Sequence, residues 1–173
     1  MQQSFYDASV GCYQQILEST AQMLKAGRQH AETHDQDLSE IVDYRLHETM
    51  LPFSFQVISV WHHSHGAIEG MRAGVFTPPP SKPDIDYSGL CDLVDEALGT
   101  MSQETEESMA ALSGQNMIFR LGEMEIPFTT DNFLESFSKP NFYFHTTTTY
   151  AMLRQLGTPL GKRDYLGNMK MGL

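Results

Sequence analysis

Apolar residues recur at alternating steps of three and four in the middle of this chain, and this spacing constrains the fold more than any other feature. Between positions 53 and 71 the repeat is carried by Phe53, Val57, Val60, Ser64, Ala67 and Met71. Residues at these steps form one stripe along an α-helix, and the stripe must pack against other elements. Pro52 suits the first turn of such a helix, and Gly74 suits its C-terminal end. We therefore predict a long helix with one buried face here.

Three further stretches have helical periodicity, at residues 5–27, 86–114 and 140–157. Ser4 and Asp86 are suitable N-caps for the first two of them. The inner face of the middle stretch is expected to contain Leu90, Val94, Ala97, Met101, Thr105 and Leu112. Helix dominates and strand is marginal, so we predict an all-α four-helix bundle that forms one domain over residues 1–173.

The segments between the helices carry signals of their own. The run TPPPSKPD cannot continue a helix, because proline lacks the N–H donor, and we interpret it as the crossover linker of the bundle. The segment NMIFRLGEMEIPF predicts a small hairpin that turns at Gly122-Glu123. Short helical pieces are expected at Ser39–Met50 and Asn132–Phe137.

The tail after Gly157 has no helical periodicity and is expected to be loop-like. Its segment GKRDYLG nevertheless carries cations next to the end of the last helix, where positive charge is favoured. We therefore expect this segment to be ordered, with Tyr165 and Leu166 packed against the bundle.

The charge of the chain limits its partners. Its 11 basic and 22 acidic residues give a formal net charge of −11, which repels phosphate backbones and anionic lipid. We expect no nucleic-acid or membrane partner. The lack of a long apolar run and of a basic N-terminal stretch predicts a cytoplasmic protein. Cys12 and Cys91 lie far apart without metal or redox spacing, so both are interpreted as small core residues.

The last helix contains the most informative residue of the chain, His145. At about 100° per residue, Thr149, Met152 and Leu156 fall within roughly 40° of it, which places His145 in the middle of the buried stripe. We expect it to be mostly buried, with its ring hydrogen-bonded or bound to a metal. Two interpretations stay open: a structural histidine bonded to a threonine or a backbone carbonyl, or an acid/base or ligand group in a cavity of the bundle.

Three more histidines occur in the second helix, in the segment WHHSH, and they project to different sides of it. His62 falls opposite the apolar stripe, so we expect it to face solvent and to be dispensable. His63 falls on one flank beside Gln56, and these two residues are best placed to reach a cavity shared with His145. His65 falls on the other flank.

Two other patterns resemble functional motifs only superficially. His30 and His34 have the i,i+4 spacing that can chelate a divalent metal, but their surroundings are polar, and we interpret them as an exposed, adventitious pair. The stretch from Gly157 to Arg163 resembles a phosphate-binding loop. It lacks one spacer residue, has arginine where serine or threonine should follow the lysine, and comes after a helix rather than a strand. These departures exclude such a loop.

The last helix and the tail, PNFYFHTTTTYAMLRQLGTPLGKRDYLG, resemble the C-terminal signature of a family of uncharacterised domains in the DinB/YfiT-like superfamily. The segment from Leu46 to Gly74 also resembles its counterpart in that family. The resemblance implies a four-helix bundle, often a homodimer, with a possible metal site in its core.

The same resemblance bears on the metal. Metal-binding members of the superfamily typically use one histidine from the second helix and two from the last helix, four residues apart. This implies His63 and His145 as ligands of a divalent ion such as zinc or nickel. The third position is Thr149, whose neutral hydroxyl is a poor replacement for imidazole. We therefore predict no cofactor and no stoichiometric metal.

Three functions are compatible with these residues. The favoured one is a metal-independent isomerase, lyase or cyclase for a small, largely apolar molecule, with His145, His63 and Thr149 as catalytic residues. Its substrate would contact Gln56, Trp61, Phe142 and Met152. The second is a DinB-like metal-dependent transferase or hydrolase with His63 and His145 as ligands. The third is a non-catalytic binding or dimerisation module in which His145 is structural.

Overall fold

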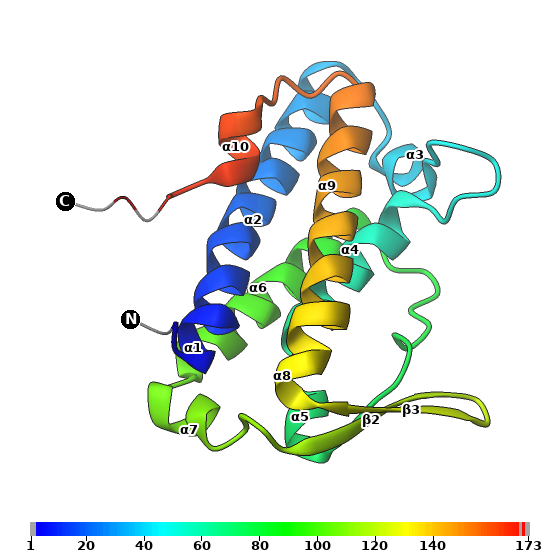
Figure 1. Ribbon diagram of the computed structural model, residues 1–173. Coiled ribbons are helices and arrows are strands. Elements are labelled where there is room, and N and C mark those ends of the chain that lie inside the picture. Colours follow the sequence, from blue (N-terminus) through cyan, green and yellow to red (C-terminus); the bar gives the residue numbers. More distant parts are fainter. Residues whose placement is uncertain (1–2, 170, 172–173) are drawn as a thin grey trace.

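Four long helices dominate the computed structural model, which describes residues 3–169 and 171 (Figure 1). These helices are α2 (Val10–Thr33), α4 (Phe53–Trp61) with its continuation α5 (Ala67–Ala73), α6 (Tyr87–Gln103) and α9 (Lys139–Gln155). Both α2 and α4 contact α6 and α9, so the four helices close around a common core. The predicted four-helix bundle is confirmed, with a small sheet added at one end.

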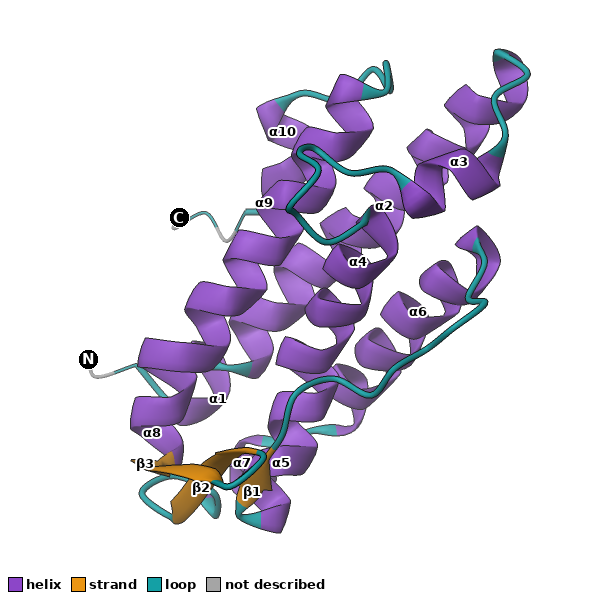
Figure 2. Ribbon diagram, turned by 90° about the vertical axis from the view of Figure 1, so that its right-hand side faces the viewer, coloured by secondary structure: helices purple, strands orange, loops and turns teal. Residues whose placement is uncertain are grey.

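The long linker between the second and third helices sets the topology of the bundle. Figure 2 shows it running along the bundle from β1 (Val75–Phe76), at the sheet end, to the start of α6 at the far end. As a result α4 and α6 run in the same direction, opposite to α2 and α9. Bundles with a long crossover connection have this kind of arrangement. The interpretation of residues 77–84 as the crossover is confirmed.

Local caps set most of the helix ends as predicted. The Asp86 side chain caps α6 by accepting a backbone N–H in the first turn. Ser4 caps only the short α1 (Phe5–Ala8), because the predicted first long helix is broken at Ser9 and α2 starts at Val10. Gly74 ends α5 with a φ of 70°, in the left-handed region that glycine adopts readily. Pro52 is the N-cap of α4 rather than its first helical residue.

The prediction that the first long helix ends near Gly27 is wrong, because α2 continues to Thr33. A Cβ atom at Gly27 would lie 2.7 Å from the Tyr87 hydroxyl and 2.8 Å from a Leu153 methyl group. That hydroxyl donates to the Leu24 carbonyl at 2.8 Å. The glycine therefore allows α6 and α9 to approach α2 closely, and it does not stop the helix.

The third helix is shorter than its periodicity predicts. It ends at Gln103, so Thr105 and Leu112 do not belong to its inner face. Thr105 instead caps α7 (Glu106–Ala110): its hydroxyl accepts the Ser108 N–H, and the Ser108 hydroxyl accepts the Thr105 N–H. This reciprocal capping box starts a new helix where the apolar repeat alone would extend the old one.

The predicted hairpin is confirmed and belongs to a larger sheet. It consists of β2 (Asn116–Leu121) and β3 (Met124–Thr129), and Gly122 turns between them with a φ of 58°. β1 pairs in parallel with β2, so the strand order is β1-β2-β3. This third strand was not predicted, because two residues directly after a helix are too short to show an alternating pattern.

Both helices that carry the candidate histidines contain a π-helical turn. The turn η1 (His62–Gly66) joins α4 to α5, and η2 (Leu134–Ser138) joins α8 (Thr130–Phe133) to α9. The piece predicted at Asn132–Phe137 is therefore continuous with the last helix and not separate from it. A π turn holds one extra residue, so it shifts the phase of side chains along the helix. In α9 the turn precedes Pro140, which has no N–H to donate.

Within the tail, the segment GKRDYLG is ordered, as predicted, but it is not loop-like throughout. It contains the short helix α10 (Lys162–Leu166), which packs on α2. The Gln15 amide donates to the Leu166 carbonyl at 2.8 Å, and the Tyr165 ring lies 6.0 Å from that of Tyr150. The packing of Tyr165 against the bundle is confirmed, while Leu166 is held there through its carbonyl.

Three smaller features complete the comparison with the sequence. The helix α3 covers Leu38–Asp43, only part of the piece predicted at Ser39–Met50. Cys12 and Cys91 are free thiols that lie partly exposed at the edge of the core rather than inside it. In the described part of the chain, no helix combines the length and the apolar character needed to cross a membrane.

Candidate functional site

His145 projects from α9 onto Gln56 of α4. Its Nδ1 lies 2.8 Å from the Gln56 Oε1. The Gln56 amide is 3% exposed, and its nitrogen donates to the Leu51 carbonyl at 3.0 Å. Because the amide nitrogen is used on Leu51, the amide oxygen faces the histidine, and Nδ1 of His145 must carry the proton. The neutral ring is thereby held with a lone pair on Nε2.

The surroundings of His145 keep it uncharged. It is half-buried, and burial lowers its pKa to about 4. Two aromatic rings meet it edge-on, Phe55 at 5.9 Å and Phe144 at 5.2 Å between ring centroids. The predicted position on the bundle side of α9 and the hydrogen-bonded ring are confirmed, while the burial is less complete than predicted.

His63 of the η1 turn stacks on His145. The ring centroids are 6.0 Å apart and the planes differ by 13°. His63 is 7% exposed, and burial, together with the neighbouring His62 and His145, lowers its pKa to about 3. Its Nδ1 is buried and has no hydrogen-bond partner among residues 3–169 and 171. Such an unpaired buried atom is costly and calls for an explanation.

A buried chain of hydroxyl groups holds the η1 turn in place. The Ser138 hydroxyl donates to the His63 carbonyl at 2.8 Å, and it accepts from the Tyr13 hydroxyl at 2.7 Å. Burial raises the pKa of Tyr13, so this phenol stays protonated and remains a donor. The chain links α2, η2 and η1 at the level of the two histidines. No pattern in the sequence indicated the pairing of Tyr13 with Ser138.

The prediction that His62 faces solvent is wrong. His62 is 7% exposed, its Nε2 donates to the Thr77 carbonyl at 2.7 Å, and its ring stacks on Phe76 at 4.4 Å. Thr77 begins the crossover linker, so the linker covers the face of the helix that the projection left open. A Cβ atom at Gly66 would lie 2.7 Å from the His62 ring, so this glycine makes room for it.

Trp61 and His65 face α6 and the crossover linker. The Trp61 N–H donates to Glu96 at 2.9 Å, and the Lys82 ammonium lies 4.7 Å from the centre of the indole ring. His65 stacks on Trp61 at 5.2 Å, and its Nδ1 lies 2.7 Å from the Thr100 hydroxyl. None of these contacts involves the paired histidines of the candidate site, so a substrate role for Trp61 stays a prediction.

Three further predicted site residues lie in the core of the bundle on α9. The fully buried Thr149 hydroxyl donates to the His145 carbonyl at 2.9 Å. Phe142 is fully buried and meets Tyr13 edge-on at 4.9 Å, and Met152 is also fully buried. These side chains support the helix that carries His145, and their roles toward a substrate stay predictions.

The donors near His145 do not fit a metal centre with three protein ligands. In the described part of the chain, no three histidine, cysteine, aspartate or glutamate side chains form a group that could hold a metal ion. Thr149 gives its hydroxyl proton to the backbone. His63 and His145 alone leave a divalent ion short of the three ligands typical of catalytic zinc. His30 and His34 do not form such a centre either, because no third histidine, cysteine, aspartate or glutamate joins them within the described residues.

Known proteins place this fold. A search of the curated proteins finds no match. A crystal structure of a DinB family member protein from Shewanella denitrificans is similar, with a TM-score of 0.79 and 21% sequence identity over 97% of this chain and 94% of that one. The family model described as "Domain of unknown function (DUF1993)" matches residues 5–166. The chain therefore has a DinB-like fold and belongs to the DUF1993 family.

Proposed function

We propose that this protein is a metal-independent enzyme for a small, largely apolar molecule, with His145 as its general base. The observation that carries the proposal is the contact between His145 Nδ1 and Gln56, whose own orientation is fixed by Leu51. This series of hydrogen bonds leaves the lone pair of His145 Nε2 as the proton acceptor. A histidine oriented by a second group in this way is a recurring feature of acid/base sites.

The lowered pKa narrows the reaction type. With a pKa of about 4, His145 is neutral at pH 7 and able to accept a proton, but it is a weak base. Carboxylates of similar basicity remove protons next to carbonyl groups in known isomerases. His145 is therefore best suited to an isomerisation, or to an elimination that begins with removal of a proton next to a carbonyl group.

His63 and Thr149 act as positioning residues in this proposal. His63 fixes the plane of the His145 ring by stacking on it, and Thr149 bonds the His145 backbone. Gln56 sets which ring nitrogen is free. The network therefore determines the direction of the lone pair, which governs the rate of proton transfer.

One observation favours a second candidate, a non-catalytic binding module. The same burial that keeps His145 neutral also suits a histidine that only accepts a hydrogen bond from a bound molecule. Fold alone does not choose between the two, because the same fold can host unrelated functions.

The test is proton exchange from a mixture of small carbonyl compounds incubated with the protein in D₂O. We expect deuterium incorporation into at least one compound with the parent protein, and loss of that signal with His145→Gln. His47→Gln is the matched control, because His47 is exposed and its ring bonds the nearby Thr49. Binding without exchange would support the binding module, and exchange that survives in His145→Gln would overturn the base assignment.

A further inference from the structure

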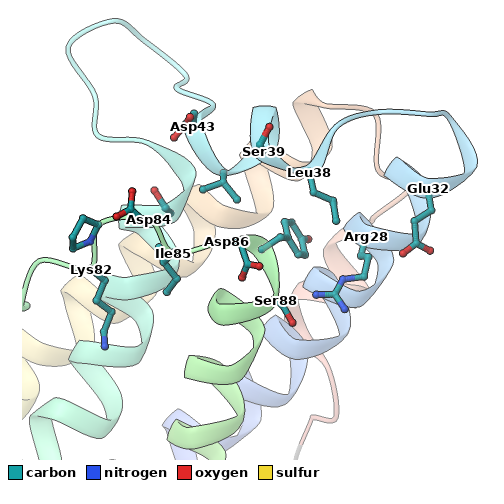
Figure 3. A pocket seen from close by; sticks show the side chains of 14 residues that line it. Arg28, Glu32, Leu38, Ser39, Asp43, Lys82, Asp84, Ile85, Asp86 and Ser88 are labelled. Carbon is teal, nitrogen blue, oxygen red and sulfur yellow. The ribbon is translucent and has the colours of Figure 1, made fainter.

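A cavity of about 750 Å³ lies between α3 and the start of α6, at the end of the bundle away from the sheet (Figure 2). Figure 3 shows the residues that line it. Its walls come from α2, α3, the start of α6 and the crossover linker. Its lining includes neither His145 nor His63, so it is separate from the proposed base. The volume falls within the range of small-molecule sites, and apolar side chains contribute to the wall, among them Leu38, Val42 and Ile85.

Arg28 is a cation on one side of this cavity, and it has no anionic partner among the residues that the structure describes. It is partly buried, and its Nε has no hydrogen-bond partner in the described part of the chain. The guanidinium lies 5.5 Å from the centre of the Tyr87 ring and otherwise reaches the Cys91 sulfur at 3.8 Å. Glu32 follows it at i,i+4 spacing, yet no ion pair joins the two. A guanidinium held in this way is free to take a carboxylate on its planar edge.

The opposite side of the cavity is acidic. Figure 3 shows Asp43 and Asp84 across the cavity from Arg28. Within residues 3–169 and 171, neither carboxylate has a hydrogen bond or an ion pair. Asp84 has a φ of 61°, in the left-handed region that residues other than glycine seldom adopt. Lys82 makes no ion pair with it, and the Lys82 ammonium lies over the Trp61 ring.

We propose that this cavity binds an organic zwitterion of the size of an apolar di- or tripeptide. The carboxylate of the ligand pairs with Arg28, its ammonium group faces Asp43 and Asp84, and its side chains contact the apolar wall. The ligand should carry no net charge, because the formal charge of −11 on the protein repels a simple anion at long range. A simple cation, in turn, leaves the guanidinium unpaired.

The test is calorimetric titration of the full chain with leucyl-leucine, with its N-acetyl derivative and with its C-terminal amide. We expect leucyl-leucine to bind, and each blocked form to bind at least about ten-fold more weakly, because each has lost one charge pair. Arg28→Gln should lower the affinity for leucyl-leucine to the affinity that the parent protein has for the C-terminal amide. The matched control is Arg120→Gln, because Arg120 pairs with Glu125 on the exposed hairpin, away from the cavity.

The acidic side has its own test. In the double variant Asp43→Asn/Asp84→Asn, leucyl-leucine and its N-acetyl derivative should bind with affinities within about three-fold of each other. The proposal is overturned if leucyl-leucine does not bind the parent protein, or if either blocked form binds it equally well. Circular dichroism establishes that each variant is folded. Should Arg28→Gln not fold, the comparison of the three ligands on the parent chain decides the question.

Discussion

The two faces of the η1 turn each bury a histidine, but the two rings differ in their hydrogen bonding. On the outer face, His62 gives a proton to the Thr77 carbonyl and stacks on Phe76. On the inner face, His63 stacks on His145, yet its Nδ1 has no hydrogen-bond partner in the described chain. Both side chains are 7% exposed, so the degree of burial does not explain the difference.

This contrast separates a structural histidine from one that costs stability. A buried polar atom without a partner costs about 1–3 kcal/mol, whereas a satisfied one contributes to stability. Proteins retain such costs mainly where function requires them. The outer face therefore holds the crossover linker onto the bundle, and the inner face belongs to the proposed site.

The largest expected effect is a loss of stability in mild acid. The pKa of His63 is lowered to about 3 and that of His145 to about 4, while both take up a proton near pH 6.5 in the unfolded chain. The unfolded state thus binds more protons between pH 6.5 and 4. Above this window the two histidines do not reduce the free energy of unfolding. As the pH falls through the window, each of them lowers it by up to about 1.4 kcal/mol per pH unit.

Urea unfolding at pH 7 and at pH 5 measures this loss. His63→Leu is the informative comparison, because it removes one of the two titrating groups on the inner face. We expect the free energy of unfolding of His63→Leu to change less with pH than that of the parent. The difference between the two slopes should be up to about 1.4 kcal/mol per pH unit. Parallel pH dependences of the two proteins would contradict the assignment of His63 as a buried neutral imidazole.

The next largest effect is expected on the outer face. His62→Ala removes the bond to Thr77 and the stacking on Phe76, and it leaves a space under the linker. We expect a loss of about 1–3 kcal/mol in the free energy of unfolding. The exposed His47→Ala is the control, with a change of no more than about 0.5 kcal/mol. An equally small change in His62→Ala would show that the linker does not depend on this contact.

His62 also shows where prediction from the sequence stops. A uniform rotation of about 100° per residue placed it opposite the apolar stripe. That rotation holds as far as His62, whose N–H still bonds the Ile58 carbonyl, but it carries no information on the linker that covers this face. Within α9, which lies after its own π turn, the same rotation correctly placed His145 on the bundle side.

The fold follows from local signals more completely than the site does. Apolar repeats, the Ser4 and Asp86 caps and the proline-rich linker predicted the bundle and its crossover. Gln56 was found because it shares a helix flank with His63. The Ser138 and Thr77 contacts come from residues distant in the chain, and only packing brings them to the histidines.

A smaller effect is expected when the inner histidine is replaced. His63→Leu keeps a side chain of moderate size and removes the unpaired Nδ1, and the Ser138 bond to the backbone carbonyl remains available. At pH 7 we expect stability to be unchanged or to rise by up to about 1 kcal/mol. Chemical unfolding at pH 7 measures the change. A loss comparable to that of His62→Ala would mean that Nδ1 has a partner in solution and would remove the contrast between the two faces.

The smallest expected effect is that of added metal. A metal ion on the inner face would pair with the unpaired Nδ1 of His63, so its absence or presence tests the contrast between the two faces. Among the described residues, only His63 and His145 are available there, and the Thr149 hydroxyl donates to the His145 carbonyl. Two imidazoles leave zinc or nickel short of three protein ligands, so we expect protein purified without a histidine tag to contain well under one equivalent. Added zinc should raise the melting temperature of the parent and of His145→Ala by the same small amount, because any weak binding takes place elsewhere. Elemental analysis that found about one equivalent in the parent, and none in His145→Ala, would overturn this prediction. It would also explain the unpaired nitrogen of His63 and make the metal-dependent function the better one.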